Sequence, residues 1–182
     1  MKYESDDLFH GIPVKIYSLK NPRIGGTIIR RILPSDIEPL ERLFFRTVRQ
    51  INVRDYTKEQ VEAWAPANGD FDKWRKSFEG KSVFVSEEKS VVSGFCELEP
   101  NGHIDRFYVS ADRIGQGLGR MMYQALEQEA SVLKIRRLFA EASITAKPFF
   151  EKMGFTVVKE QVVNVKGIAM TNFVMEKKLP QP

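Results

Sequence analysis

A glycine-rich stretch just past the middle of the chain, residues 109–120, constrains the fold more than any other feature. It reads Val-Ser-Ala-Asp-Arg-Ile-Gly-Gln-Gly-Leu-Gly-Arg. This pattern predicts the end of a strand, a turn with glycines at 115, 117 and 119, and then a helix. Glycine lets the backbone approach a ligand with its N–H groups turned inward, and the helix adds the positive end of its dipole. Such a turn holds a pyrophosphate without a metal ion or a lysine.

Several kinds of turn share these glycines, and the flanking residues separate them. A Walker loop ends in Gly-Lys-Ser/Thr, whereas Gly119 is followed by Arg120 and Met121. A dinucleotide-binding turn belongs to an early βαβ unit, whereas a hairpin pattern precedes this turn. The remaining interpretations are the coenzyme A loop of an acyltransferase, which the flanks favour, and an ordinary strand–helix turn.

Composition excludes several classes of protein. The 182 residues are enough for one domain with a substantial core. The net charge of +4, spread along the chain, mildly favours an anionic ligand but does not indicate a nucleic-acid-binding surface. The single cysteine, Cys96, excludes an internal disulfide and a cysteine-built metal site. With no apolar run long enough for a bilayer and an acidic start unlike a signal peptide, we expect a cytoplasmic protein without membrane or nucleic-acid partners.

The periodicity of apolar residues predicts the order of the elements. Residues 1–26 are expected to form an N-terminal arm with a short strand at 14–19, and residues 27–182 a single domain. Helices are expected behind caps at Ser35, Thr57 and Thr145, at residues 71–78 and after the glycine loop. Strands are expected at 27–33, 82–86, 91–99, 103–109, 137–142, 155–165 and 168–179. This order predicts an α/β fold with a mixed, mostly antiparallel central sheet of about seven strands, flanked by about four helices.

The element order and two motifs resemble the GNAT superfamily of acetyl-CoA-dependent N-acetyltransferases over residues 27–179. The first motif is the glycine loop, and the second is Ala-Lys-Pro-Phe-Phe-Glu-Lys-Met-Gly-Phe at 146–155, which is similar to the family's Asn…Ala…Leu-Tyr-Glu-Lys-x-Gly-Phe. Residues 33–36, 55–57, 63–66 and 101–105 resemble the YafP-type subgroup of bacterial acetyltransferases. The resemblance implies a sheet splayed between strands 4 and 5. It also implies transfer of an acetyl group from acetyl-CoA to a primary amine, without a metal ion, and in many members a homodimer.

The resemblance also implies a set of cofactor-binding residues, and the sequence departs from the family pattern at three of them. Ile114 stands where Gln or Arg is usual, so Arg113 is expected to reach the phosphates instead. Ser143 replaces an asparagine. Phe150 replaces the tyrosine often proposed as general acid, which leaves protonation of the thiolate to water or another residue. The full set is Phe107, Tyr108, Val109, Arg113, Ile114, Gly115, Gln116, Gly117, Leu118, Gly119, Arg120, Ser143, Ala146, Phe149 and Phe150.

The implied chemistry is direct attack of a neutral amine on the thioester, so the proton of the amine needs an acceptor. His103 matches the position of the glutamate base in histone-acetylating relatives, and His103 and Asp105 both match catalytic histidines of the arylalkylamine branch. In a regular strand these two residues share a face with Phe107 and Val109. We therefore take His103 and Asp105 as candidate catalytic residues. The alternatives are a surface histidine beside a turn, and an aspartate that binds the acceptor amine or pairs with an arginine.

Three further residues are candidate substrate contacts. Glu97 and Glu99 share a face of the preceding strand, and Trp64 lies in a region that covers the acceptor site in the family. The competing interpretations are a solvated strand face and ordinary core packing. The arginines of the first helix, among them Arg42 and Arg46, are expected on a solvated face, with a phosphate or acidic-substrate contact as the weaker alternative.

Two other functions remain open at this point. One is an acyl-CoA-binding regulatory module with little or no catalysis, which Ile114 and Phe150 favour. The other is a structural or toxin-neutralising partner protein, against which the glycine loop argues. The sequence does not identify the acceptor amine.

Overall fold

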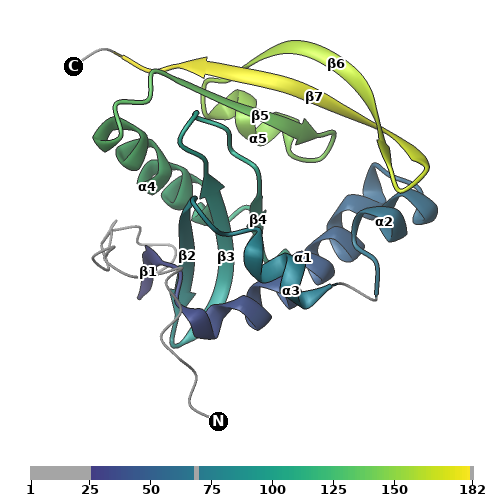
Figure 1. Cartoon of the computed structure of the whole chain (residues 1–182), viewed down its shortest axis with the longest axis horizontal. Coiled ribbons are helices and arrows are strands. Elements are labelled where there is room, and N and C mark those ends of the chain that lie inside the picture. Colours follow the sequence, from purple (N-terminus) through teal and green to yellow (C-terminus); the bar gives the residue numbers. More distant parts are fainter. Residues whose placement is uncertain (1–25, 68–69, 181–182) are drawn as a thin grey trace.

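The computed structural model describes residues 26–67 and 70–180, so the expected strand at 14–19 lies outside the described residues. Within them the elements follow the predicted order, with five α-helices instead of about four (Figure 1). Short 3₁₀ turns occupy Pro34–Asp36, Asn52–Arg54 and Ala111–Arg113. The strands are β1 (Thr27–Arg31), β2 (Ser82–Glu88), β3 (Val91–Leu98), β4 (Phe107–Val109), β5 (Arg137–Ser143), β6 (Thr156–Val165) and β7 (Ile168–Lys178). The helices are α1 (Ile37–Ile51), α2 (Lys58–Trp64), α3 (Phe71–Lys76), α4 (Leu118–Val132) and α5 (Lys147–Lys152).

The seven strands form two antiparallel sheets, β1-β2-β3-β4 and β5-β7-β6. The sheets meet where the segment before β4 runs parallel to the start of β5. There the Ile104 N–H donates to the Phe139 carbonyl at 2.8 Å, and the Phe139 N–H donates to the Gly102 carbonyl at 3.0 Å. β5 pairs with β7 along its whole length, whereas β4 pairs with β3. The expected splay between the fourth and fifth strands is therefore confirmed.

Strand β4 is shorter than the expected 103–109, because a β-bulge interrupts its pairing with β3. The Glu97 N–H donates to the Arg106 carbonyl and the Glu99 N–H to the His103 carbonyl, both at 2.9 Å. Two residues along β3 thus correspond to three on the facing segment, which is the signature of one inserted residue.

The bulge changes which side chains share a face. Phe107 and Val109 pack with Ile104 in the core cluster that includes α4. Asp105, in contrast, lies beside Arg106 in a cavity lined by α1 and α3. The expectation that residues 103, 105, 107 and 109 all point the same way was therefore wrong, since strict alternation holds only for an uninterrupted strand.

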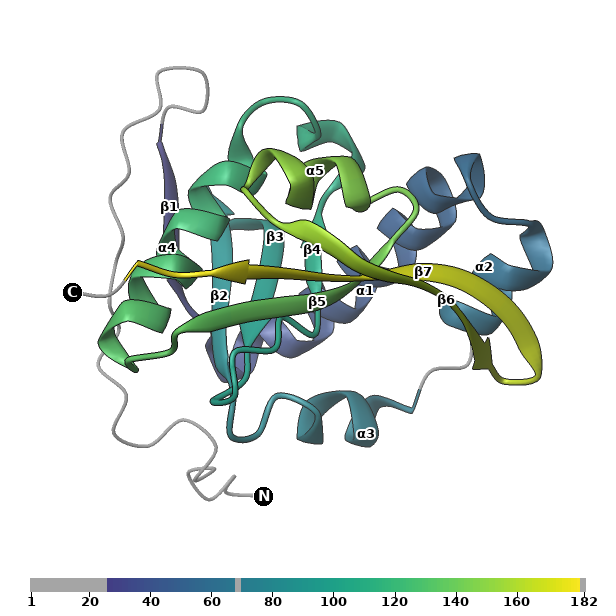
Figure 2. The ribbon, with the colours of Figure 1, turned by 90° about the horizontal axis from the view of Figure 1, so that it is seen from above.

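Helices cover both faces of the first sheet, with α4 on one side and α1 and α3 on the other (Figures 1 and 2). The alternation of β2 divides its apolar side chains between the two layers. Phe84 packs in the core cluster that contains Met122 and Leu126 of α4, and Val83 and Val85 pack in the cluster that contains α1. These fully buried side chains hold α4 against the sheet, and with it the glycine loop from which α4 begins.

The helix caps agree with the sequence in part. At α2, the Thr57 hydroxyl accepts from the Gln60 N–H and the Gln60 side chain accepts from the Thr57 N–H, as expected. The expected cap at Ser35 is wrong. The chain forms a 3₁₀ turn there, and Asp36 accepts from the Leu33 N–H at 2.7 Å before α1 begins.

The cap at Thr145 is also wrong. The Ser143 hydroxyl accepts from the Ala146 N–H at 3.1 Å, whereas the Thr145 hydroxyl donates to Asp55 at 2.7 Å. Thr145 therefore ties the start of α5 to the segment between α1 and α2.

Candidate active site

The glycine loop places backbone donors at the start of α4. Gly115 and Gly117 have φ of +80° and +95°, a region that side chains other than glycine rarely adopt. Gly117 caps α4, and the first four N–H groups of a helix have no partner within it. A Cβ at Gly119 would lie 3.0 Å from the Phe149 ring, so glycine lets the first turn of α4 pack against α5. These donors, with the positive helix end behind them, fit a pyrophosphate.

At the loop entrance, the one cationic side chain expected to reach the phosphates is already paired. The Arg113 guanidinium forms an ion pair with Glu88 and donates to the Gln116 side chain at 3.4 Å. Ile114 is 48% exposed. An approaching phosphate would therefore compete with Glu88 for Arg113, and the role expected of Arg113 stays a prediction.

The outer edge of β4 offers backbone groups to a ligand. The Glu97 N–H donates to the Arg106 carbonyl and the Ser110 N–H to the Ser93 carbonyl. Because antiparallel pairing alternates, the backbone groups of Phe107 and Val109 point away from β3, toward the side where β5 diverges. The Val109 carbonyl accepts a hydrogen bond from Thr47 at 3.3 Å. An extended, amide-bearing chain can pair with the other groups of this edge.

Phe150 lies in the aromatic core between β4 and α5. It is 3% exposed, and its ring makes edge contacts with Phe107, Phe149 and Phe155 at centroid distances of 6.0, 5.5 and 5.1 Å. The side chain at this position therefore contributes packing and carries no proton that a thiolate could take.

A buried hydroxyl that we did not predict joins three segments near the end of β5. Tyr56 donates to the Thr171 carbonyl at 2.7 Å and accepts from the Ile144 N–H at 2.9 Å. Burial raises the pKa of Tyr56, so the hydroxyl stays protonated. Its role in the structure is to hold β7 and the end of β5 together.

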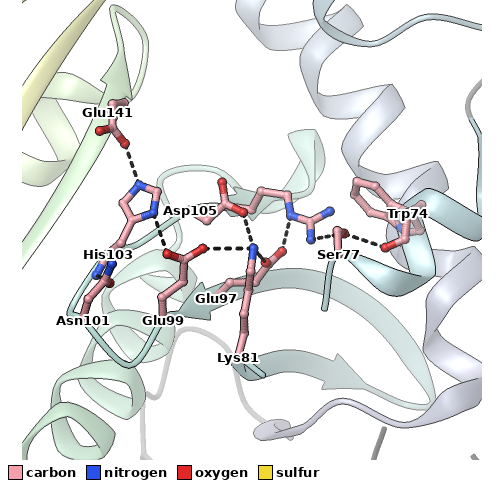
Figure 3. Close-up of polar contacts among 10 residues, drawn as sticks. Trp74, Ser77, Lys81, Glu97, Glu99, Asn101, His103, Asp105 and Glu141 are labelled. Carbon is pink, nitrogen blue, oxygen red and sulfur yellow. Dashed lines mark hydrogen bonds and ion pairs between the residues drawn. The ribbon is translucent and has the colours of Figure 1, made fainter. Parts of the chain in front are cut away.

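On the other side of β4, Lys81 lies at the centre of three carboxylates (Figure 3). Its Nζ is 3.2 Å from Glu97 and 3.3 Å from Glu99, and it donates to Asp105. Burial lowers the pKa of Lys81, but the hydrogen bond to Asp105 and the charge of Glu97 outweigh it and raise the pKa overall. Burial likewise raises the pKa of Asp105, and the bond to Lys81 outweighs this and lowers the pKa below its ordinary value. Asp105 is thus an ionised carboxylate at neutral pH.

Glu97 is fully buried and forms an ion pair with Arg106 as well as with Lys81. Burial raises the pKa of its carboxyl, against the attraction of both cations. The Arg106 guanidinium lies over the Trp74 ring at 4.3 Å and donates to the Ser77 hydroxyl at 2.6 Å. Glu97 therefore holds both cations in place from a fully buried position.

His103 sits where β4 and β5 are still together. Its Nδ1 lies 3.2 Å from Glu99 and its Nε2 lies 2.5 Å from Glu141, while its ring stacks on Phe139 at 4.9 Å. Through Glu99 it is connected to Lys81, and through Lys81 to Asp105. The two candidate catalytic residues therefore belong to one polar network (Figure 3).

A cavity of about 1090 Å³ opens between α1, α3, the β6–β7 turn and the segment before β4. Of the candidate catalytic and substrate-binding residues, only Asp105 is among those lining it. Trp64 packs edge-on against Tyr56 at 5.6 Å. The lining residues are Glu41, Arg42, Phe44, Phe45, Arg46, Pro66, Ala67, Asp70, Phe71, Lys73, Trp74, Ser77, Asp105, Arg106 and Lys166. The roles expected of His103, Glu97, Glu99 and Trp64 stay predictions.

Lys81, Arg106 and Glu141 belong to this network, and the sequence analysis did not single them out. Lys81 directly precedes Ser82, which faces Leu98 across the hairpin, so the register of β2 on β3 would have placed Lys81 opposite Glu99. For Arg106 the bulge hid the signal, because its position depends on the inserted residue. Glu141 is brought to His103 by the parallel contact with β5, which no local pattern reveals.

Comparisons by sequence show which proteins this chain is similar to. Residues 52–178 match the family model described as an acetyltransferase (GNAT) domain. The chain is 32% identical over 150 residues to the uncharacterized N-acetyltransferase YafP of Escherichia coli strain K12, covering 82% of this chain and 95% of that protein.

Solved structures share the fold. A GCN5-related N-acetyltransferase from Rhodopseudomonas palustris superposes with a TM-score of 0.79 at 32% identity, covering 83% of this chain and 94% of that one. YncA from Salmonella typhimurium, a putative acetyltransferase solved with acetyl-CoA, superposes with a TM-score of 0.66 at 22% identity, covering 87% of this chain and 96% of that one.

Among the described residues, no helix has the length and apolar character to cross a bilayer.

Proposed function

The chain belongs to the GNAT family and is an acetyl-CoA-dependent N-acetyltransferase, and we propose that its acceptor is a primary amine that attacks the thioester directly. One observation carries the proposal. The donors of the glycine loop, the outer edge of β4 and the Asp105 carboxylate follow one another along a single stretch of chain, and Asp105 lines an open cavity. The cofactor and the acceptor can therefore meet at β4 from opposite sides.

Acetyl-CoA, when bound, supplies an acetyl group activated as a thioester. The N–H groups of the glycine loop would hold its pyrophosphate, and the outward N–H groups of Phe107 and Val109 would hold its amide chain and the thioester oxygen. The acceptor nitrogen forms a bond to the acetyl carbon, and the C–S bond breaks. Since Phe150 has no proton to give, the leaving thiolate would take one from water or from another residue.

The network around Lys81 suggests separate roles for the two candidate catalytic residues. A carboxylate with a lowered pKa, such as Asp105, accepts protons poorly at neutral pH but attracts a cationic amine. We therefore place Asp105 at the acceptor amine. Imidazole is the side chain best suited to take up a proton near neutrality, and we propose that His103 receives it through water and passes it to Glu141 at the surface.

The alternative is an acyl-CoA-binding regulatory module that keeps the cofactor loop and has little or no turnover. The absence of a hydroxyl at Phe150 favours it. Binding of acetyl-CoA does not separate the two functions, but turnover with any amine does.

The test combines calorimetric titration of acetyl-CoA with CoA release across a panel of amines. We expect Asp105→Asn to lower kcat/KM by roughly 10- to 100-fold, as for the loss of one charge-assisted contact, with acetyl-CoA affinity unchanged. Asp72→Asn, on the exposed side of α3 and outside the cavity, is the matched control. Unchanged turnover in Asp105→Asn would contradict the role of Asp105. Tight binding with no release on any amine would favour the regulatory module.

A homodimer and a cytoplasmic location, both expected from the sequence, stay predictions. Sedimentation of the purified chain would decide the first, and fractionation of cells that express it would decide the second.

A further inference from the structure

The strand side of the cavity is negatively charged. Asp105 reaches the cavity, and the surrounding network sets two cations, Lys81 and Arg106, against three carboxylates, Asp105, Glu97 and Glu99. Lys81 is shared among the three acids, whereas Arg106, which also lines the cavity, pairs with Glu97 and donates to the Ser77 hydroxyl. What this end presents to an acceptor is therefore the remaining negative charge, which suits an amine in its cationic form.

The outer side of the cavity, formed by α1, α3 and the β6–β7 turn, carries mostly cations, and two of these are already neutralised. Arg42 pairs with Glu38 at 2.6 Å along α1. Lys73 lies 3.2 Å from Asp70, which also caps α3. These pairs cancel within the helices and leave little charge for a ligand.

Two cations on this outer side remain available. Unlike Arg42 and Lys73, neither Arg46 nor Lys166 forms an ion pair or hydrogen bond with a carboxylate within residues 26–67 and 70–180. Arg46 is near enough to Asp112 to contribute to lowering the pKa of that carboxyl. Glu41 is the one acid of this side without such a pair in the same ranges, so the outer side keeps a positive excess.

Resting on the acetyl transfer proposed above, we propose that the acceptor is a small amine that also carries an anionic group. Its amine lies at Asp105, and its anionic group binds Arg46 and Lys166. Aromatic side chains also line the cavity, among them Phe44 and Trp74, and they would exclude water from the apolar part of the acceptor. A cavity of about 1090 Å³ has room for more than one spacing between amine and anion.

The test uses amino acids of increasing spacing between amine and carboxylate, aromatic and aliphatic, each beside the amine that lacks the carboxylate. For the best spacing we expect kcat/KM to be about 10-fold higher for the amino acid than for its amine, as for one charge-assisted contact. Arg46→Ala and Lys166→Ala should each lower the value for the amino acid about 10-fold and leave the plain amine within about 2-fold. Lys159→Ala, an exposed lysine of β6 outside the cavity, should change neither.

Equal kcat/KM within every pair would overturn the inference, and so would variants that weaken both members of a pair equally. Failure of this inference can be separated from failure of the proposed function by calorimetry. Each amino acid and its matching amine are titrated into the CoA-loaded protein. If no amine is acetylated, selective binding of the amino acid that is lost in Arg46→Ala still supports the charge arrangement. No difference in binding between the members of a pair overturns it.

Discussion

Gly102 lies at the point where the two sheets are joined, and replacing it with alanine measures how firmly that junction is held. Its φ is +92°. A Cβ there would overlap the carbonyl oxygen of Arg137 and lie 2.9 Å from Cγ2 of Ile135. Because close-packed interiors leave no room for such an atom, the start of β5 has to move by roughly 1 Å.

The expected cost follows from three contributions. The left-handed backbone costs alanine about 1 kcal/mol relative to glycine. A shift of β5 breaks the hydrogen bonds of Phe139 to Gly102 and of Ile104 to Phe139, each worth about 1 kcal/mol and more where the groups stay buried without a partner. We therefore expect Gly102→Ala to lower the free energy of unfolding by about 3–5 kcal/mol, or Tm by roughly 6–20 °C for a chain of this size.

The matched control is Gly167→Ala in the turn between β6 and β7. Its φ is +88°, and an added Cβ meets no atom within 4 Å. This variant has only the backbone cost, about 1 kcal/mol, which corresponds to roughly 2–4 °C. Urea unfolding followed by circular dichroism gives both values. If Gly102→Ala and Gly167→Ala lose the same stability, the close contact with Arg137 does not hold the junction and the reasoning is refuted.

Three further outcomes are expected. The stability difference between wild type and Asp105→Asn should be present above about pH 4 and vanish as pH falls, because a carboxyl with a lowered folded-state pKa stabilises the fold only while ionised. A half-exposed pair of this kind contributes about 1 kcal/mol or less. Thermal scans across pH would show a constant difference if Asp105 were not paired. Cys96 is buried and burial raises its pKa, so a thiol reagent should modify it only on unfolding; rapid labelling of the native protein would contradict this. Phe150→Ala should lower stability by about 3–5 kcal/mol by leaving a cavity in the aromatic core, and a loss of turnover without a loss of Tm would instead place the ring in catalysis.

Local patterns in the sequence were enough for much of the fold. Three features of the structure depend on residues within a few positions of one another. They are the glycine loop, the capping box of Thr57 and Gln60, and the turn at Gly167. The caps expected at Ser35 and Thr145 failed because longer-range partners took over. Asp36 is bound by Arg30 of β1, and Thr145 by Asp55 from another part of the chain.

The candidate site was predictable only in part, for the same reason. His103 and Asp105 were found from their distance to the glycine loop, but strict alternation placed them on the wrong face because nothing local marks the bulge at 103–106.

The sequence by itself determined the order of the elements, the phosphate-binding turn and the absence of a hydroxyl at Phe150. Hydrogen bonding and apolar periodicity over short stretches decide the first two of these features, and the third follows from the residue type alone. Only the tertiary structure decided that Lys81 would bind Asp105, that Glu141 would reach His103, and that cations from α1 and the β6–β7 turn would face the same cavity. These contacts join segments far apart in the chain, so they depend on sheet register, the bulge and helix packing, and on the need of buried charges for partners.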